Sequence, residues 1–279
     1  METSQNHFFK HLLADFSLKN WCDIEEAYFS ELISLEKSRY YPNNPTKLNQ
    51  YFEVIKKHLA GYLKTQNESQ PIQSYQTLFK TIDASNTLII NFNYTDTLQK
   101  LYRNDIQDSR IIHLHGELEN PENPMIFGYA ATHEESRKLL DKNENEYLRN
   151  IKKHLYKRTS NEKKIADYLD KTGRLDISIF GHSCGLSDNL ILKQLFCHNN
   201  VETIRTFYYE NVECHFQAQV NVDRIMNDDD KFKKWIDFQT SHRMPQWNDS
   251  AEQIDAFDKY IRMFHNTQIR QRPIVPSSF

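Results

Sequence analysis

Two stretches near the start of the chain carry hydrophobic residues at the spacing of an α-helix. In residues 23–37 (DIEEAYFSELISLEK) and 46–66 (TKLNQYFEVIKKHLAGYLKTQ), apolar side chains recur every three or four positions. Acidic residues open the first stretch, as the N-terminus of a helix prefers. The pattern therefore predicts a helical N-terminal part over residues 1–80.

Farther along the chain, short apolar runs alternate with helical stretches. The runs are NTLIINFNY (86–94), RIIHLHGEL (110–118), NPMIFGYA (123–130), RLDISIFGHS (174–183) and ETIRTFYY (202–209). Strands separated by helices imply parallel pairing through crossover connections. We expect an α/β fold with a doubly wound, mainly parallel sheet of four or five strands and a large helical addition. The whole chain, residues 1–279, is predicted to be one domain, with the sheet in residues 86–210 and a helical C-terminal part in residues 211–266.

Polar residues follow three of these runs at the point where each ends. Asn93, His115 and Ser183 are the candidates, and ligands of such sheets bind beyond the carboxyl ends of the strands. We therefore expect the three side chains to line one cleft. His113 lies two residues before His115, and we expect its ring to serve packing.

Composition narrows the choice of partners. The net charge is −3 and no basic tract is present, which argues against nucleic-acid binding. Mean hydropathy is −0.76, and no apolar run approaches the ~18 residues of a membrane span. No secretory leader is recognisable, so the cytoplasm is the expected location. The four cysteines are widely spaced, so we expect reduced thiols and no metal site.

The segment GHSCG (181–185) has two interpretations. It fits G-x-S-x-G, the nucleophile elbow of serine hydrolases, with Ser183 as nucleophile. That interpretation needs a downstream acid and histidine, for which Asp223 or Asp237 with His242 or His265 are the candidates. The alternative is a tight turn in which Ser183 or Asp188 caps the next helix, whose N-terminus would suit an anion.

Three motifs in this order, FNYTDTL, HLHGEL and FGHSCGLSD, resemble the AbiH-type abortive-infection proteins of bacteria. WCDIEEAYFSEL and IFGYA…DKNENEYLRNIKKHLY are also similar to that family. The family in turn resembles the sirtuin-like, Rossmann-like fold, where such motifs surround NAD. The resemblance implies catalytic roles for Asn93 and His115, and NAD contacts at Gly116, Gly181 and Ser183. It leaves Asp188 either to bind a ribose or to cap its helix.

The resemblance also implies an activity and its partners. Sirtuin-like defence proteins are often NAD hydrolases, so we expect a dinucleotide or nucleotide ligand, with NAD either bound or hydrolysed as substrate. A phage protein is the expected trigger and a homo-oligomer the expected assembly. Family members open on a strand and a GNGFD-like turn, whereas this sequence opens with METSQNHFFKHLLADF. We therefore expect this chain to cleave NAD poorly or not at all, because that turn would hold the pyrophosphate. The alternatives are a catalytically inactive interaction module on the same scaffold and a serine hydrolase.

Overall fold

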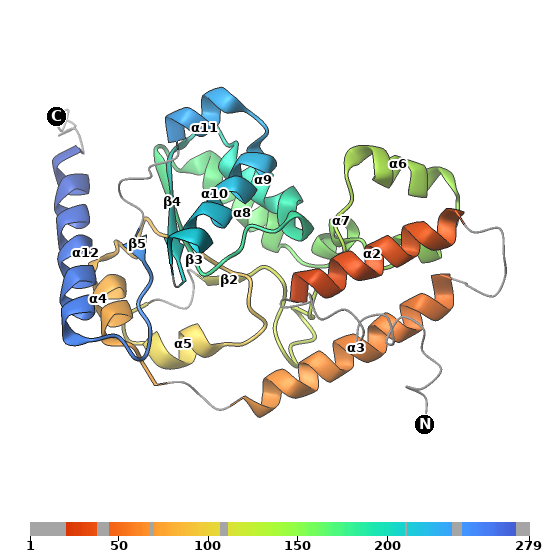
Figure 1. Cartoon of the computed structure of the whole chain (residues 1–279), viewed down its shortest axis with the longest axis horizontal. Coiled ribbons are helices and arrows are strands. Elements are labelled where there is room, and N and C mark those ends of the chain that lie inside the picture. The colour runs from red at the N-terminus through yellow and green to blue at the C-terminus, as the bar shows by residue number, and fades with distance from the viewer. Residues whose placement is uncertain are drawn as a thin grey trace, which may run out of the picture.

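Helices dominate the computed structural model, which describes residues 21–37, 45–66, 70–106, 111–209, 211–235 and 242–271 (Figure 1). Only helices occur in the described residues before β1. The α-helices are α2 (Trp21–Lys37), α3 (Pro45–Thr65), α4 (Gln73–Thr81), α5 (Thr97–Tyr102), α6 (His133–Asp141), α7 (Lys152–Leu155), α8 (Asn161–Lys171), α9 (Asn189–Phe196), α10 (Val212–Met226), α11 (Asp229–Trp235) and α12 (Ala251–Gln271). Short 3₁₀ turns are η3 (Asn145–Leu148), η4 (Tyr156–Arg158) and η5 (Leu186–Asp188).

The strands confirm the α/β class with parallel pairing. One sheet joins β1 (Ile89–Asn91) to β2 (Ile111–His113), and the other has the order β3 (Leu175–Phe180), β4 (Val201–Tyr208), β5 (His242–Arg243). Every pairing is parallel, with Ile90 opposite Ile112 in the first sheet.

The expectation of a single sheet was wrong, because in the described residues β1 and β3 are not paired. Side chains rather than backbone hydrogen bonds connect the two sheets. Ile90 and Ile112 of the first sheet pack in the same apolar core as Ile177 and Ile179 of the second. Strand pairing depends on which edges meet in space, which the apolar pattern of each strand does not encode.

Two further expectations about strands also differ from the structure. Residues 123–130 form only isolated bridges, because the segment doubles back on the loop after β2, where the Ile126 N–H donates to the His115 carbonyl at 2.6 Å. The C-terminal part, expected to be helical, contains β5, whose residues pair with Phe207 and Tyr208 of β4.

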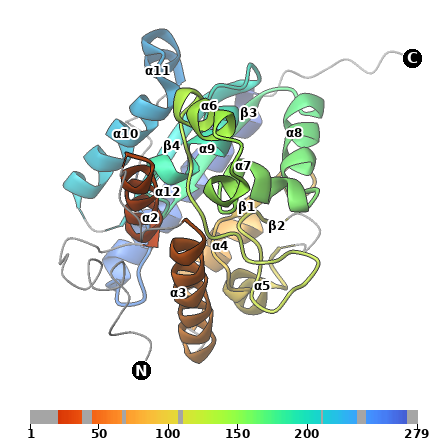
Figure 2. The same cartoon turned by 90° about the vertical axis from the view of Figure 1, so that its right-hand side faces the viewer.

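Helices cover both faces of the β3–β4 pair, as expected for a doubly wound arrangement. Successive side chains of a strand point to opposite faces. On one face, Ile179 and Ile204 join a core to which α8, α9 and α10 contribute. On the other, Phe180 stacks on Phe207 at 4.1 Å, and Phe257 of α12 joins them. In Figures 1 and 2, α12 runs alongside α4 at the edge of the molecule.

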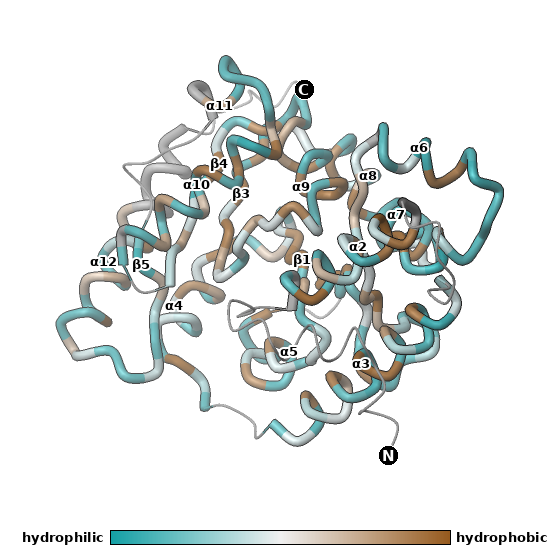
Figure 3. The backbone as a smooth tube through the Cα atoms, turned by 45° about the vertical axis from the view of Figure 1, so that its right-hand side comes forward, coloured by the Kyte–Doolittle hydropathy of each residue, from teal (hydrophilic) through white to brown (hydrophobic). Residues whose placement is uncertain are grey.

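The N-terminal helices build a second, aromatic core against the loops that follow β2. Tyr28 of α2 stacks on Phe52 of α3 at 4.0 Å, and Phe52 stacks on Phe127 at 4.8 Å. Hydrophobic segments gather toward the interior in Figure 3, while the outer turns are mostly hydrophilic. None of the described helices combines the length and the apolar character that crossing a bilayer requires.

Candidate functional site

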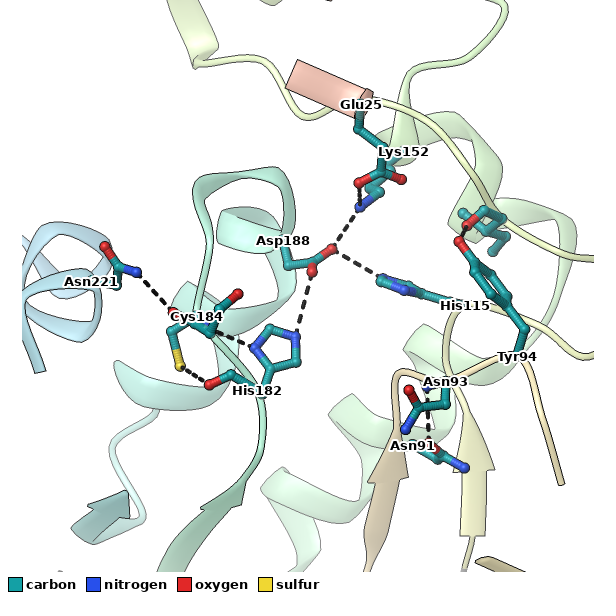
Figure 4. A network of polar contacts seen from close by, with 12 residues as sticks. Glu25, Asn91, Asn93, Tyr94, His115, Lys152, His182, Cys184, Asp188 and Asn221 are labelled. Carbon is teal, nitrogen blue, oxygen red and sulfur yellow. Dashed lines mark hydrogen bonds and ion pairs between the residues drawn. The ribbon is translucent and has the colours of Figure 1, made fainter. Parts of the chain in front are cut away.

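The loop after β2 and the turn after β3 meet around one buried carboxylate, that of Asp188 in η5 (Figure 4). Its Oδ1 atom lies 3.0 Å from His115 Nε2 and 2.8 Å from Lys152 Nζ. Its Oδ2 atom lies 3.4 Å from His182 Nε2. Glu25 of α2 completes the group, because its Oε2 atom lies 2.7 Å from Lys152 Nζ. We call these five residues the Asp188 cluster.

His115 has one ring nitrogen held and one without a hydrogen bond among the described residues. Its Nε2 atom faces Asp188 and also lies 3.1 Å from the Tyr156 hydroxyl. A carboxylate only accepts hydrogen bonds, so Nε2 carries the proton in the neutral ring and Nδ1 keeps its lone pair. The Phe92 ring meets His115 edge-on at 5.1 Å. This arrangement fixes the tautomer of a histidine whose second nitrogen can take up a proton.

His182 is held at both ring nitrogens. The backbone N–H of Cys184 donates to its Nδ1 atom at 2.9 Å, and Nε2 faces Asp188. Cys184 itself takes a left-handed backbone conformation with φ of 53°. His182 is therefore a turn residue that also supports Asp188, and it has no free nitrogen to act as a base.

Glu25 and Lys152 link the N-terminal helices to this site. Lys152 begins α7 and is only 1% exposed, and Glu25 is 4% exposed. The second oxygen of Glu25 accepts a hydrogen bond from the Gly128 N–H at 2.9 Å. A buried ammonium group between two carboxylates is the pairing that a low-dielectric interior demands.

The charges of the cluster set the protonation of its members. Burial raises the pKa of Glu25, which Lys152 offsets only in part. Burial acts in the same direction on Asp188, but the charges of Lys152 and His115 hold the pKa of Asp188 well below its usual range. The pKa of Lys152 is raised, because the two carboxylates outweigh the effect of its burial. Asp188 and Lys152 are therefore an ion pair at neutral pH.

Asn93 lies beyond the end of β1 with its side chain exposed, and its backbone is held on both sides. Its N–H donates to the Asn91 side chain at 2.9 Å, and its carbonyl lies 3.2 Å from His113 Nδ1. The other nitrogen of His113 contacts Gln99. His113 is thus fully engaged in structure, and Asn93 lies on the same side of the strands as His115 in Figure 4.

The predicted contact residues are placed unequally around the cluster. Gly116 is buried with φ of 82°, directly after His115. Gly181 has φ of 63° and opens the turn after β3. Ser183 is exposed, and its carbonyl accepts a hydrogen bond from the Asn221 side chain at 2.8 Å. The structure joins His115 to Asp188 directly, whereas no hydrogen bond links the Ser183 side chain to the Asp188 cluster.

Asp188 does not cap its helix with its side chain. It occupies the N-cap position of α9, but its side chain makes no capping hydrogen bond. Its oxygens are turned instead toward Lys152, His115 and His182. Asp188 therefore organises the site, and a ribose would have to compete with these partners.

The geometry at Ser183 does not match a nucleophile elbow. A serine nucleophile needs a histidine within hydrogen-bond reach, and Ser183 Oγ has no such partner among the described side chains. The strained backbone position belongs to Cys184, whereas in an elbow it belongs to the nucleophile. Burial raises the pKa of the Cys184 thiol to about 12, so that thiol also stays protonated and unreactive. Asp237 and the side chain of His265 lie outside the described residues.

Sequence reasoning missed Glu25 and Lys152 as members of the site. Each could have been recognised from the sequence, because each is a charged residue at a position that the helical spacing assigns to the apolar side of its helix. Glu25 is spaced three and seven residues before the buried Tyr28 and Leu32, and Lys152 three residues before the buried Leu155. Charged side chains are rarely buried without a partner. Two residues of opposite charge, each within an apolar stripe, can therefore be predicted to pair with each other.

The described residues contain a surface hollow that lies apart from the site, and no cluster of metal-binding side chains. A shallow surface hollow is lined by Pro71, Gln73, Gln76, Thr77 and Lys80, away from the Asp188 cluster. No three side chains of the metal-binding types His, Cys, Asp and Glu are grouped to hold an ion in the described part of the chain.

Comparison with known protein families relates the chain to a family of phage-defence proteins. The family model described as "Bacteriophage abortive infection AbiH" matches residues 2–210, which include all five members of the Asp188 cluster. No curated protein and no solved structure matches the chain significantly.

Proposed function

Because the chain belongs to the AbiH family of bacteriophage abortive-infection proteins, we propose that it defends bacteria by cleaving NAD beside His115. The observation that carries the proposal is the pair of His115 and Asp188. A buried, ionised carboxylate fixes the tautomer of a histidine that lies at the end of a parallel strand. Ligands of parallel sheets bind at this end of the strands.

In the proposed reaction, His115 acts as general base. The bond between nicotinamide and C1′ of the ribose breaks, and nicotinamide leaves with the electron pair. A water oxygen bonds to C1′, and the proton that it loses passes to His115 Nδ1. Asp188, 3.0 Å from Nε2, stabilises the imidazolium that forms. The exposed amide of Asn93 can hydrogen-bond both the water and a ribose hydroxyl.

A second candidate function has its own support. Both carboxylate oxygens of Asp188 are engaged by side chains of the protein itself. Such a cluster also serves to fasten α2 and α7 to the sheets. The alternative is therefore an interaction module without catalytic activity, in which the Asp188 cluster only stabilises the fold.

Release of nicotinamide from NAD separates the two functions. We expect the purified chain to release nicotinamide slowly, and His115→Ala to lower that turnover by about 10²–10⁴-fold, as loss of a general base does. Asn93→Ala should also lower turnover, with the fold of both variants checked by circular dichroism. In phage-challenged cells both variants should lose protection together with NAD depletion. Protection by the wild type without nicotinamide release, retained in His115→Ala, would establish the interaction module instead.

A further inference from the structure

Four side chains form a continuous line of alternating charge that begins in α2 and ends at His115. Glu25, Lys152, Asp188 and His115 follow one another at 2.7, 2.8 and 3.0 Å. Each of the four is less than a tenth exposed. They belong to α2, α7, η5 and the loop after β2, so the line crosses four separate parts of the fold.

We propose that Glu25 and Lys152 are positioning residues, which hold the Asp188 carboxylate against His115 and set how readily that ring takes a proton. The role rests on the proposed function of His115 as a base. Neither residue contacts the free nitrogen of His115, so both act through Asp188. Their contribution is electrostatic, because charges separated by a few ångströms in a low-dielectric interior interact strongly.

The sign and position of each charge determine whether it favours or opposes protonation of His115. Lys152 is the nearer charge and is positive, so it opposes protonation of His115. Glu25 is farther along the line and negative, so it favours protonation of His115, and burial has raised the pKa of Glu25 itself. With both carboxylates and the ammonium charged, the line carries one net negative charge, which a proton on His115 neutralises.

Other groups also face the ring and must be held constant in any test. None of them is altered in the variants described below. From the remaining elements, Tyr156 of η4 and Tyr94 after β1 face the His115 ring, and His182 after β3 faces the Asp188 carboxylate.

The test is a pH titration of the histidines in the full chain, monitored by NMR on protein with labelled histidine. The signal of His115 is assigned by its disappearance in His115→Gln. Lys152→Met should raise the titration midpoint of His115 by about one pH unit or more, as the loss of a neighbouring cation does. Glu25→Gln should lower it by a smaller amount. Lys259→Met is the matched control, because Lys259 pairs with Asp255 at 2.6 Å on the exposed surface of α12 and should leave the midpoint unchanged.

Opposite shifts for the two variants support the proposal, and equal shifts or none overturn it. If Lys152→Met does not fold, Glu25→Gln decides alone, since a purely structural role would leave the midpoint of His115 in place. The pH profile of turnover should move in the same directions with little change in KM. The titration needs no NAD, so its failure is distinguishable from failure of the proposed reaction.

Discussion

His113 and His115 are separated by a single residue, yet their surroundings assign them different tasks. Both nitrogens of His113 are engaged, with Gln99 and with the carbonyl of Asn93. His115 keeps one nitrogen without a hydrogen bond in the described structure and faces an ionised carboxylate with the other. Sequence position alone does not distinguish the two, because the partners come from distant segments.

This contrast predicts different outcomes for two alanine variants. His115→Ala should lower nicotinamide release by about 10²–10⁴-fold while the protein stays folded. His113→Ala should retain most of the turnover but lose about 1–3 kcal/mol of stability, because it leaves buried polar groups unpaired. Steady-state kinetics and thermal unfolding of both variants measure the difference. Equal losses of turnover would show that His115 has no special role.

Ser183 gives a separate prediction. Its side chain is exposed and lacks a histidine partner among the described residues, so the wild type should not react with a fluorophosphonate probe. Ser183→Ala should then behave like the wild type in turnover and in phage protection. Labelling of the wild type that disappears in Ser183→Ala would establish the serine hydrolase.

The periodicity of single elements was sufficient to predict most helices and the parallel strands. It was not sufficient to predict that β1 and β3 are unpaired, because pairing is decided by distant edges. Periodicity also did not identify Lys152 and Glu25 as site residues, because these two residues pair with each other across 127 positions of sequence. The candidates His115 and Asp188 were found because motifs at strand ends share one edge of the fold.

The conformation of the turn after β2 depends on Gly116, so substitution of this glycine should disturb the turn. A Cβ atom on Gly116 would lie 2.2 Å from the Pro124 carbonyl oxygen, and its φ of 82° disfavours other residues. Gly116→Ala should therefore destabilise the protein by more than about 1 kcal/mol and displace His115. Thermal unfolding and nicotinamide release should both decline.

A matched control for this variant exists in α3. Gly61 has open space where a Cβ would lie, and it sits within the helix. Gly61→Ala should gain about 0.5–1 kcal/mol of stability, since glycine is unfavourable inside helices. Destabilisation by Gly61→Ala as large as that by Gly116→Ala would mean that the close approach to Pro124 is not the cause.

At the scale of the whole molecule, the Asp188 cluster joins the aromatic N-terminal core to the core around the sheets. Lys152→Met would leave two buried carboxylates without their cation, so we expect a loss of about 3–5 kcal/mol. Lys259→Met, at an exposed pair, should cost at most about 1 kcal/mol. Chemical denaturation of both variants compares the two losses.

The pH dependence of stability follows from the same ion pair. The pKa of Asp188 is lowered in the folded protein, so its contribution is complete above the ordinary pKa of an aspartate and is lost only as pH falls through the lowered value. The raised pKa of Glu25 acts in the opposite direction, since it favours the folded state as pH falls. We expect the stability difference between the wild type and Lys152→Met to shrink as pH falls, because protonation removes the unpaired charges of Asp188 and Glu25 in the variant. A stability difference that stays constant or grows on acidification would contradict the ion pair.

The packing of α4 against α12 has a consequence for synthesis on the ribosome. Thr77 of α4 donates a hydrogen bond to Asp258 at 3.3 Å, and Leu78 packs against the aromatic cluster that Phe257 completes. The chain must grow from the end of α4 at Thr81 to the start of α12 at Ala251 before this contact can form. At bacterial elongation rates this takes about 10–30 s. During that interval the apolar side of α4 lacks its partner, so we expect chaperones to bind the nascent chain until α12 emerges.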